Sequence, residues 1–332
     1  MSTLSRITTT CAVLGVAITL LMQGVTVAQD VVSPLTLTSD DGHRVHIFPA
    51  PAFAALLAAD TGPLIYHTNG PVMQAGVTAY AIFWVPAKLQ NGGATSMTAH
   101  YQTVQTNMLG DYAGHGLGSN NTQYYETIKS INKKYIQDKG GFGGSYVDTS
   151  AYPTSGCTDS VTPGNCITDA QVQAEIKKVM GLNGWTGGLS KIFFLFTSSG
   201  EGSCFTSAST SCAYTNYCAY HGAISGTTPI VYGNEPYGAS SLCNTAPPSP
   251  NSDPDADTAA TALSHELTEA ITDPQLNAWF TAQGNEIGDL CAYNYGTNSW
   301  DSAKANQMWN GRFYELQMEF DNHKGGCVQV GP

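Results

Sequence analysis

The stretch "SHELTEAITDP", residues 264–274, carries the pattern H-E-x-x-E. It differs from the zinc metalloprotease motif H-E-x-x-H at its last position, where Glu269 replaces the second histidine. In a helix, His265 and Glu269 lie four residues apart on one face, so both side chains reach one ion. Glu266 flanks that face, in the position of a general base that acts on a metal-bound water.

A third ligand is expected from the downstream segment "GNEIGDLC", residues 284–291. Thermolysin-like enzymes take a downstream glutamate as third zinc ligand and use a further acid to orient a ligand histidine. By this logic Glu286 binds the ion together with His265 and Glu269. Asp289 is then either the supporting acid or an alternative ligand.

The charge of this ligand set leaves the nature of the ion open. One histidine with two glutamates makes a zinc centre formally neutral, so its bound water is less acidic than at a centre with two histidines. Carboxylates also favour harder cations. The sequence therefore predicts a divalent metal, zinc first, with calcium or manganese as alternatives. An isolated H-E-x-x-E pattern also occurs on surface helices that carry no metal.

The composition indicates an exported protein. Residues 1–28 have the pattern of a secretory signal peptide: Arg6, an apolar run of about a dozen residues and a small-residue cleavage site at Ala28. The run is shorter than the roughly 20 residues that span a bilayer, so no membrane association is expected. The formal net charge is −12, with 13 lysines and arginines in 332 residues. This lacks the basic surface that nucleic-acid binding needs.

Eight cysteines remain after the signal, and an even number in an exported chain predicts up to four disulfides. Proximity in the sequence favours a bridge between Cys157 and Cys166. No C-x-x-C pair occurs, which argues against a cysteine zinc site.

Hydrophobic patterning predicts one α/β (α+β) domain over residues 63–332, preceded by a linker or pro-segment at residues 29–62. Expected strands are 77–85, 145–152, 191–198 and 229–236, and expected helices are 96–112, 168–181 and 256–272, with 122–135 as a helix or a mixture of helix and strand. Thr168 is expected to cap the second helix and Gly181 to end it. Asp255 or Asp257 is expected to cap the third.

This order of elements is typical of a zincin-like domain with a twisted mixed sheet. Pro236 is expected to place the strand 229–236 at a sheet edge. In zincins such an edge borders the cleft and pairs with an extended peptide substrate. The segment 203–222 is expected to be a cysteine-rich loop. His221 within it is either a further ligand or a structural histidine, and the same two alternatives apply to His67 and His115.

Several segments resemble the phosphate-induced protein (EXORDIUM-like) family, in the microbial branch that carries H-E-x-x-E: "LIYHTNGPV", "VTAYAIFWVP", "FFLFTS", "CAYHG", "ITDPQLNAWF", "NEIGDLC" and "GGCVQV". The resemblance runs from about Gly62 to Val330 and depends on the order and spacing of these segments. It implies secretion and a shared fold. Plant members are linked to growth responses without an established enzyme activity, and some of them depart from the first motif.

The sequence thus predicts a secreted, metal-dependent peptidase-like protein with an extracellular peptide or protein substrate. Glu266 would be its base, and the metal site would comprise His265, Glu269, Glu286 and Asp289. The first alternative is a non-catalytic extracellular or cell-wall signalling protein with a structural cation. The second is a carbohydrate-active or carbohydrate-binding protein, and a glycosidase would need two carboxyls about 5–10 Å apart across an open cleft.

Overall fold

The computed structural model describes residues 33–55, 59–129, 131–243, 249–297, 299–300 and 302–332. The predicted signal peptide, residues 1–28, lies outside the described residues. The described residues form one compact unit.

A mixed sheet of seven strands forms the centre of this unit, in the order β1-β2-β11-β12-β9-β4-β7. Strands β12, β9, β4 and β7 run parallel, whereas β1, β2 and β11 pair in antiparallel fashion, and β11 is also antiparallel to β12. Their bounds are β1 (Thr36–Thr38), β2 (Arg44–Pro49), β4 (Val77–Trp84), β7 (Gly140–Asp148), β9 (Lys191–Thr197), β11 (Tyr217–Ile224) and β12 (Ile230–Glu235).

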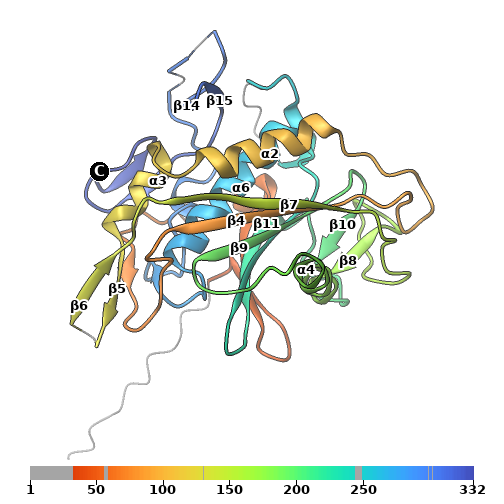
Figure 1. Cartoon of the computed structure of the whole chain (residues 1–332), viewed down its shortest axis with the longest axis horizontal. Helices are drawn as coiled ribbons and strands as arrows, with labels where there is room; N and C mark the ends of the chain where they lie inside the picture. Colours follow the sequence, from red (N-terminus) through yellow and green to blue (C-terminus); the bar gives the residue numbers. More distant parts are fainter. Residues whose placement is uncertain (1–32, 56–58, 130, 244–248, 298, 301) are drawn as a thin grey trace, which may run out of the picture. The chain divides into compact units, whose positions relative to one another are not determined.

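Helices cover both faces of the sheet (Figure 1). Helices α2 (Ala99–Asp111) and α6 (Pro254–Thr272) lie on one face, and α4 (Asp169–Asn183) lies on the other. Strand β9 shows why the sheet must be buried on both sides. Its Phe194 belongs to the apolar cluster with α2 and α6, whereas Phe193 belongs to the cluster with α4. Such continuous apolar runs are typical of parallel strands between helical layers.

Shorter elements complete the unit. They are α1 (Pro51–Ala54), β3 (Ile65–Tyr66), α3 (Gly116–Asn120), η1 (Asn121–Gln123), β5 (Tyr125–Ile128), β6 (Asn132–Tyr135), β8 (Cys166–Thr168), β10 (Gly202–Cys204), α5 (Ser240–Cys243), β13 (Trp279–Phe280), η2 (Asp289–Cys291), β14 (Gln307–Trp309), β15 (Arg312–Tyr314), β16 (Glu319–Asp321) and β17 (Gly326–Val328). In the described residues no helix combines the length and the apolar character that a membrane crossing requires.

The expected strands at 77–85 and 191–198 are confirmed as β4 and β9. The capping box at the start of α4 is also confirmed, since the Thr168 side chain accepts from the Gln171 backbone while the Gln171 side chain accepts from Thr168 N–H. The helix ends later than expected. Gly184, at φ 64°, takes the left-handed C-terminal conformation instead of Gly181.

Helix α6 is confirmed, but its cap is Asp253, whose side chain accepts from Ala256 N–H. Asp255 and Asp257 lie in the first turn, where negative charge favours the helix dipole. The helix is buried on every side, because the C-terminal segment covers the face that the sheet leaves free. Thr261 Oγ1, for instance, donates to Glu315 O at 2.8 Å.

Two expectations about strand positions are wrong. Strand β12 lies inside the sheet, between β11 and β9, since Pro236 follows its last residue and removes none of its ladder hydrogen bonds. The segment 203–222 is not all loop, because Tyr217–Ile224 forms β11. Its residues are largely buried and it pairs with β2 and β12.

One other segment also differs from expectation, and a second matches one of two alternatives. Residues 36–38 and 44–49 form β1 and β2, so this part of the expected linker or pro-segment belongs to the domain. The segment 122–135 is not one helix but a mixture, the second of the two expectations: it begins in η1 and continues as the hairpin β5–β6. Lys129, at φ 53°, lies in its turn.

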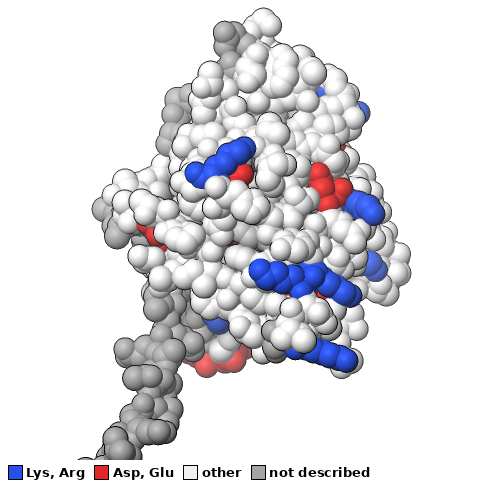
Figure 2. All heavy atoms as spheres, turned by 90° about the vertical axis from the view of Figure 1, so that its left-hand side faces the viewer, with Lys and Arg blue, Asp and Glu red and all other residues white. Residues whose placement is uncertain are grey.

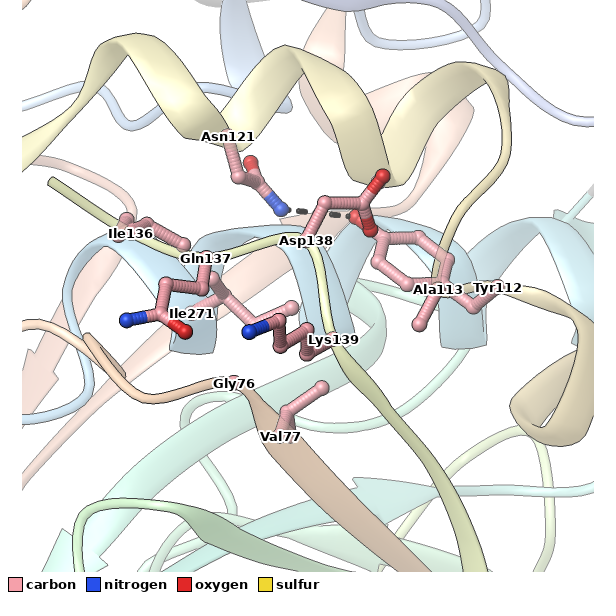
Figure 3. Close-up of a pocket in the computed structure, with 11 residues that line it drawn as sticks. Gly76, Val77, Tyr112, Ala113, Asn121, Ile136, Gln137, Asp138, Lys139 and Ile271 are labelled. Carbon is pink, nitrogen blue, oxygen red and sulfur yellow. Dashed lines mark hydrogen bonds between the residues drawn. The ribbon is translucent and has the colours of Figure 1, made fainter.

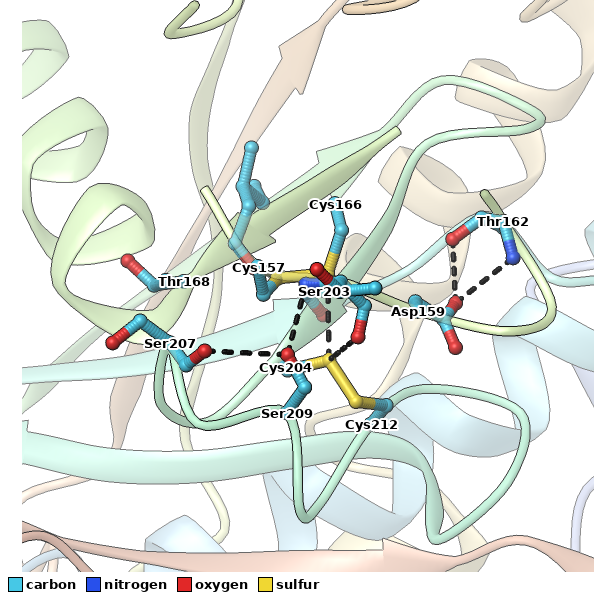
Figure 4. The surroundings of a disulfide bond; sticks show 12 residues. Cys157, Asp159, Thr162, Cys166, Thr168, Ser203, Cys204, Ser207, Ser209 and Cys212 are labelled. Carbon is cyan, nitrogen blue, oxygen red and sulfur yellow. Dashed lines mark hydrogen bonds between the residues drawn. A yellow bond between two sulfur atoms is a disulfide. The ribbon is translucent and has the colours of Figure 1, made fainter. Parts of the chain in front are cut away.

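All eight cysteines after residue 28 are paired, in the bridges Cys157–Cys166, Cys204–Cys212, Cys218–Cys243 and Cys291–Cys327. The expected Cys157–Cys166 bridge is therefore confirmed. It lies against the Cys204–Cys212 bridge, with 3.4 Å between Cys166 Sγ and Cys204 Sγ (Figure 4). Disulfides are typical of oxidising compartments. On the face shown in Figure 2, lysines and arginines form small patches, some of them beside acidic residues.

Removing a disulfide should destabilise the protein more when the loop that it closes is longer, because the entropy cost grows with the logarithm of loop length. The Cys291–Cys327 bridge spans 36 residues and the Cys157–Cys166 bridge spans nine. Replacing both cysteines of each pair with alanine should lower the free energy of unfolding by about 4 kcal/mol for the long loop and about 2.5 kcal/mol for the short one. Urea denaturation of the two variants checks this order, and equal losses would contradict it.

Candidate metal centre

Three histidines and four acids converge between helix α6 and the sheet. Strands β2 and β11 contribute one histidine each, α6 contributes three residues, and the segment that leads into η2 contributes two acids. We call this set the metal cluster: His46, His221, His265, Glu266, Glu269, Glu286 and Asp289. Each of these side chains is at most 2% exposed.

Helix α6 presents His265 and Glu269 toward the same space, with 3.1 Å between His265 Nε2 and Glu269 Oε1. The Gly288 N–H donates to that same oxygen at 3.2 Å. A Cβ at position 288 would lie 2.5 Å from His265 Nδ1, so only glycine permits this approach. The chain from Glu286 to Asp289 can therefore lie directly against the helix.

Gln317 supports His265 from the other side. Its Nε2 lies 2.8 Å from His265 Nδ1 and donates to Gly288 O at 3.0 Å. A metal on His265 Nε2 would require the proton on Nδ1, and hence an acceptor beside it. Gln317 Oε1, which has no hydrogen-bond partner among the described residues, would supply this acceptor if the amide turned over, at the cost of the hydrogen bond to Gly288 O.

Glu266 connects α6 to two strands. Its Oε1 accepts from Phe48 N–H of β2 at 3.0 Å, and its Oε2 lies 2.8 Å from His221 Nδ1 of β11. A carboxylate on Nδ1 holds the proton there and leaves Nε2 free to bind a metal. The geometry thus places Glu266 as the residue that orients His221, with both oxygens engaged.

Asp289 is held by the same kind of contact. Its Oδ2 lies 2.7 Å from His46 Nε2 and accepts from Glu286 N–H at 2.6 Å. Thr36 Oγ1 lies 3.1 Å from His46 Nδ1, where it can donate. His46 therefore orients Asp289 and leaves Asp289 Oδ1 facing the cluster.

Five ligand-type atoms of the cluster are buried without a hydrogen-bond partner in the described part of the chain. They are His221 Nε2, His265 Nε2, Glu269 Oε2, Glu286 Oε2 and Asp289 Oδ1. Buried polar atoms are almost always partnered, since each unpaired one costs about 1–3 kcal/mol. Among these atoms, His221 Nε2 lies 3.8 Å from Glu286 Oε2, and His265 Nε2 lies 3.8 Å from Asp289 Oδ1. Ligands that share one tetrahedral zinc lie about 3.3–3.6 Å apart, so the set fits a cation.

Without a cation, burial makes these acids hard to ionise. It raises the pKa of Glu269 and Glu286 well above the usual range of glutamate and that of Glu266 to about 8. Burial also lowers the pKa of His221 to about 3, helped by the nearby His46. Asp289 differs, because the contact with His46 outweighs its burial and lowers its pKa.

The structure brings together every residue that the motif predicted, namely His265, Glu266, Glu269, Glu286 and Asp289. Their roles stay predictions. Sequence reasoning missed His46 and gave His221 too little weight. The one available signal was a histidine within an apolar strand pattern, "RVHIF" in β2 and "CAYHG" in β11. His67 and His115 lie elsewhere and contact Phe280 and Trp309.

Two spaces in the described part of the chain lie away from the cluster. One of about 10 Å³, room for a single water, lies beside the last turn of α6 and is lined by Tyr112, Asp138 and Ile271 among others (Figure 3). A surface hollow of about 260 Å³ is lined by His43, Asp169 and their neighbours. No residue of the metal cluster lines either space.

Comparison of the chain with models of known protein families, with curated proteins and with solved structures finds no match. The resemblance to the phosphate-induced protein family therefore stays a prediction.

The metal-free protein should lose stability as the pH rises from about 6.5 to about 8. In this window the folded state still holds a proton on Glu266, whose pKa is about 8, whereas the unfolded glutamate is already ionised. The lowered pKa of His221 makes stability rise with pH, but only below pH 6.5, the ordinary pKa of histidine. Urea midpoints of chelator-treated protein at both pH values check this. Glu266→Gln should reduce the slope without abolishing it, since burial also raises the pKa of Glu175 and of Glu201 to about 8. A midpoint that rises with pH would contradict it.

Proposed function

We propose that this protein is an exported metalloprotein that holds a divalent cation between helix α6 and the sheet, where the cation stabilises the fold. The observation that carries the proposal is the set of five unpartnered, buried ligand atoms that face one another in the metal cluster. A structural cation would connect α6 to β11 and to the segment from Glu286 to Asp289.

A cation explains why the cluster is buried at all. Isolated carboxylates in an apolar interior carry a penalty of several kcal/mol each, and pairing with a cation offsets it. Two histidines with three carboxylates are a ligand set that zinc and manganese accept, whereas calcium prefers oxygen ligands alone. We therefore propose zinc or manganese ahead of calcium.

Burial favours the structural role over catalysis. His265, Glu266 and Glu269 are each 0% exposed, so a substrate could reach them only if the domain opened. Both oxygens of Glu266 are engaged, which leaves no free base for a metal-bound water. The interior position of β12 also removes the edge that would have paired with a peptide.

Metal-dependent peptidase activity is the second candidate. It is favoured by one observation, the presence of His265, Glu266 and Glu269 on a single helix beside further ligands, as in a zincin-like domain. The carbohydrate alternative draws no support from this site, because the carboxyls are buried and a glycosidase needs them across an open cleft.

A chelator and two variants test the proposal. Dialysis against a chelator should lower the melting temperature of the wild type. Stepwise addition of zinc or manganese should restore it, because the stability gained from binding follows RT ln(1 + [metal]/Kd). Glu269→Gln should abolish this response, since it removes a charged ligand. Glu266→Gln should retain it with about 10–100-fold weaker metal affinity, as expected for a residue that orients a ligand.

Glu201→Gln is the matched control, because Glu201 is a fully buried acid outside the cluster. It should respond to the chelator as the wild type does. A wild type whose melting is indifferent to chelator would refute the metal site. Digestion of casein that depends on added metal and is lost in Glu266→Gln would favour the peptidase over the structural role.

A further inference from the structure

The carboxylate of Glu269 has one oxygen on each side of the metal cluster. Glu269 Oε1 lies 3.1 Å from His265 Nε2, and Glu269 Oε2 lies 3.7 Å from His221 Nδ1. Two groups of potential ligands, each with atoms within 4.8 Å of one another, share this residue. They are His46, Glu269 and Asp289, and His221, Glu266 and Glu269. Each group contains one hydrogen-bonded pair, His46 with Asp289 and Glu266 with His221, and neither contains His265 or Glu286.

The first half of the cluster lies around His265. Its Nε2 has no hydrogen-bond partner in the described chain and lies 3.8 Å from Asp289 Oδ1, which has none either. His46 binds the other oxygen of Asp289 and so fixes the direction of Oδ1. This half offers one imidazole nitrogen, one carboxylate oxygen and Glu269 Oε1.

The second half repeats this arrangement around His221. Its Nε2 lies 3.8 Å from Glu286 Oε2, and neither atom has a hydrogen-bond partner within the described ranges. Glu266 binds Nδ1 of the same ring and so directs Nε2. This half also offers one imidazole nitrogen and one carboxylate oxygen. Glu269 Oε2 lies beside the same ring, 3.7 Å from its Nδ1, and has no hydrogen-bond partner among the described residues.

The charges favour two cations over one. Four carboxylates, those of Glu266, Glu269, Glu286 and Asp289, are buried with three histidines that are neutral when they bind a metal. A single divalent cation would leave a formal charge of about −2 in the interior, whereas two divalent cations would bring it to about zero. Buried net charge is costly, so one ion would leave about two of the four carboxyls protonated, whereas two ions would allow all four to ionise.

We infer that the metal cluster is a binuclear site, in which Glu269 bridges two divalent cations. One cation is bound by His265 and Asp289, and the other by His221 and Glu286. His46 and Glu266 are positioning residues that each hold one ligand. Carboxylate-bridged ions in proteins lie about 3.5–4 Å apart. The inference rests on the proposed function, since it adds a second ion to the same buried site.

Metal content distinguishes the two proposals. The full chain, refolded or dialysed with excess manganese and then freed of unbound metal, should retain two ions per chain by elemental analysis. One ion per chain would refute the binuclear site and leave the proposed function standing, because the chain would still be a metalloprotein. No retained metal, with zinc as well as with manganese, would refute both.

Electron paramagnetic resonance tests the bridge. Two manganese ions joined by Glu269 should show the exchange-coupled signal of a pair, whereas two independent ions would each show the six-line pattern of a single ion and would refute the bridge. Glu286→Gln and Asp289→Asn should each reduce the content to one ion and convert the coupled signal into the single-ion signal. Glu201→Gln should keep both ions and the coupling. Loss of metal in that control but not in Glu286→Gln would also refute the assignment.

Discussion

The carboxylate of Glu266 joins helix α6 to the two strands on which the metal cluster depends. One of its oxygens accepts from Phe48 N–H of β2, and the other contacts His221 of β11. Because this side chain is fully buried, loss of either contact would leave a polar atom without a partner at a cost of about 1–3 kcal/mol. The contact sets how closely α6 approaches the sheet, and that approach brings His265 and Glu269 next to His221.

The C-terminal part of the chain encloses this arrangement. Gln317 contacts His265, and Thr261 donates to Glu315 O, so the face of α6 away from the sheet is covered. The Cys291–Cys327 bridge fixes the segment that carries Glu286 and Asp289 to the final hairpin. Enclosure strengthens every electrostatic interaction in the cluster, because little water remains to screen it. It also separates the helix motif from any substrate, which is why the same residues suit a held cation better than an exposed reaction centre.

Much of the fold could be predicted from local patterns. Strands β4 and β9 were evident from continuous apolar runs, α4 from its capping box and α6 from its uninterrupted helical segment. The failures have local causes too. Strand β11 lies in a segment rich in cysteine, serine and threonine, which resembles a loop. Strand β12 was expected at an edge because of Pro236, but the proline lies just past the strand and leaves its hydrogen bonds intact.

The sequence by itself determined that His265 and Glu269 share a helix face, that the acids of "GNEIGDLC" follow at a usable distance, and that the cysteines after residue 28 are even in number. Helical geometry and composition suffice for these, since they involve neighbours along the chain. Only the tertiary structure decided that His46 holds Asp289 across 243 residues and that His221 faces Glu266. Such pairs follow from sheet order and from the packing of α6. The periodicity of one segment does not indicate which distant segment it contacts in the folded chain.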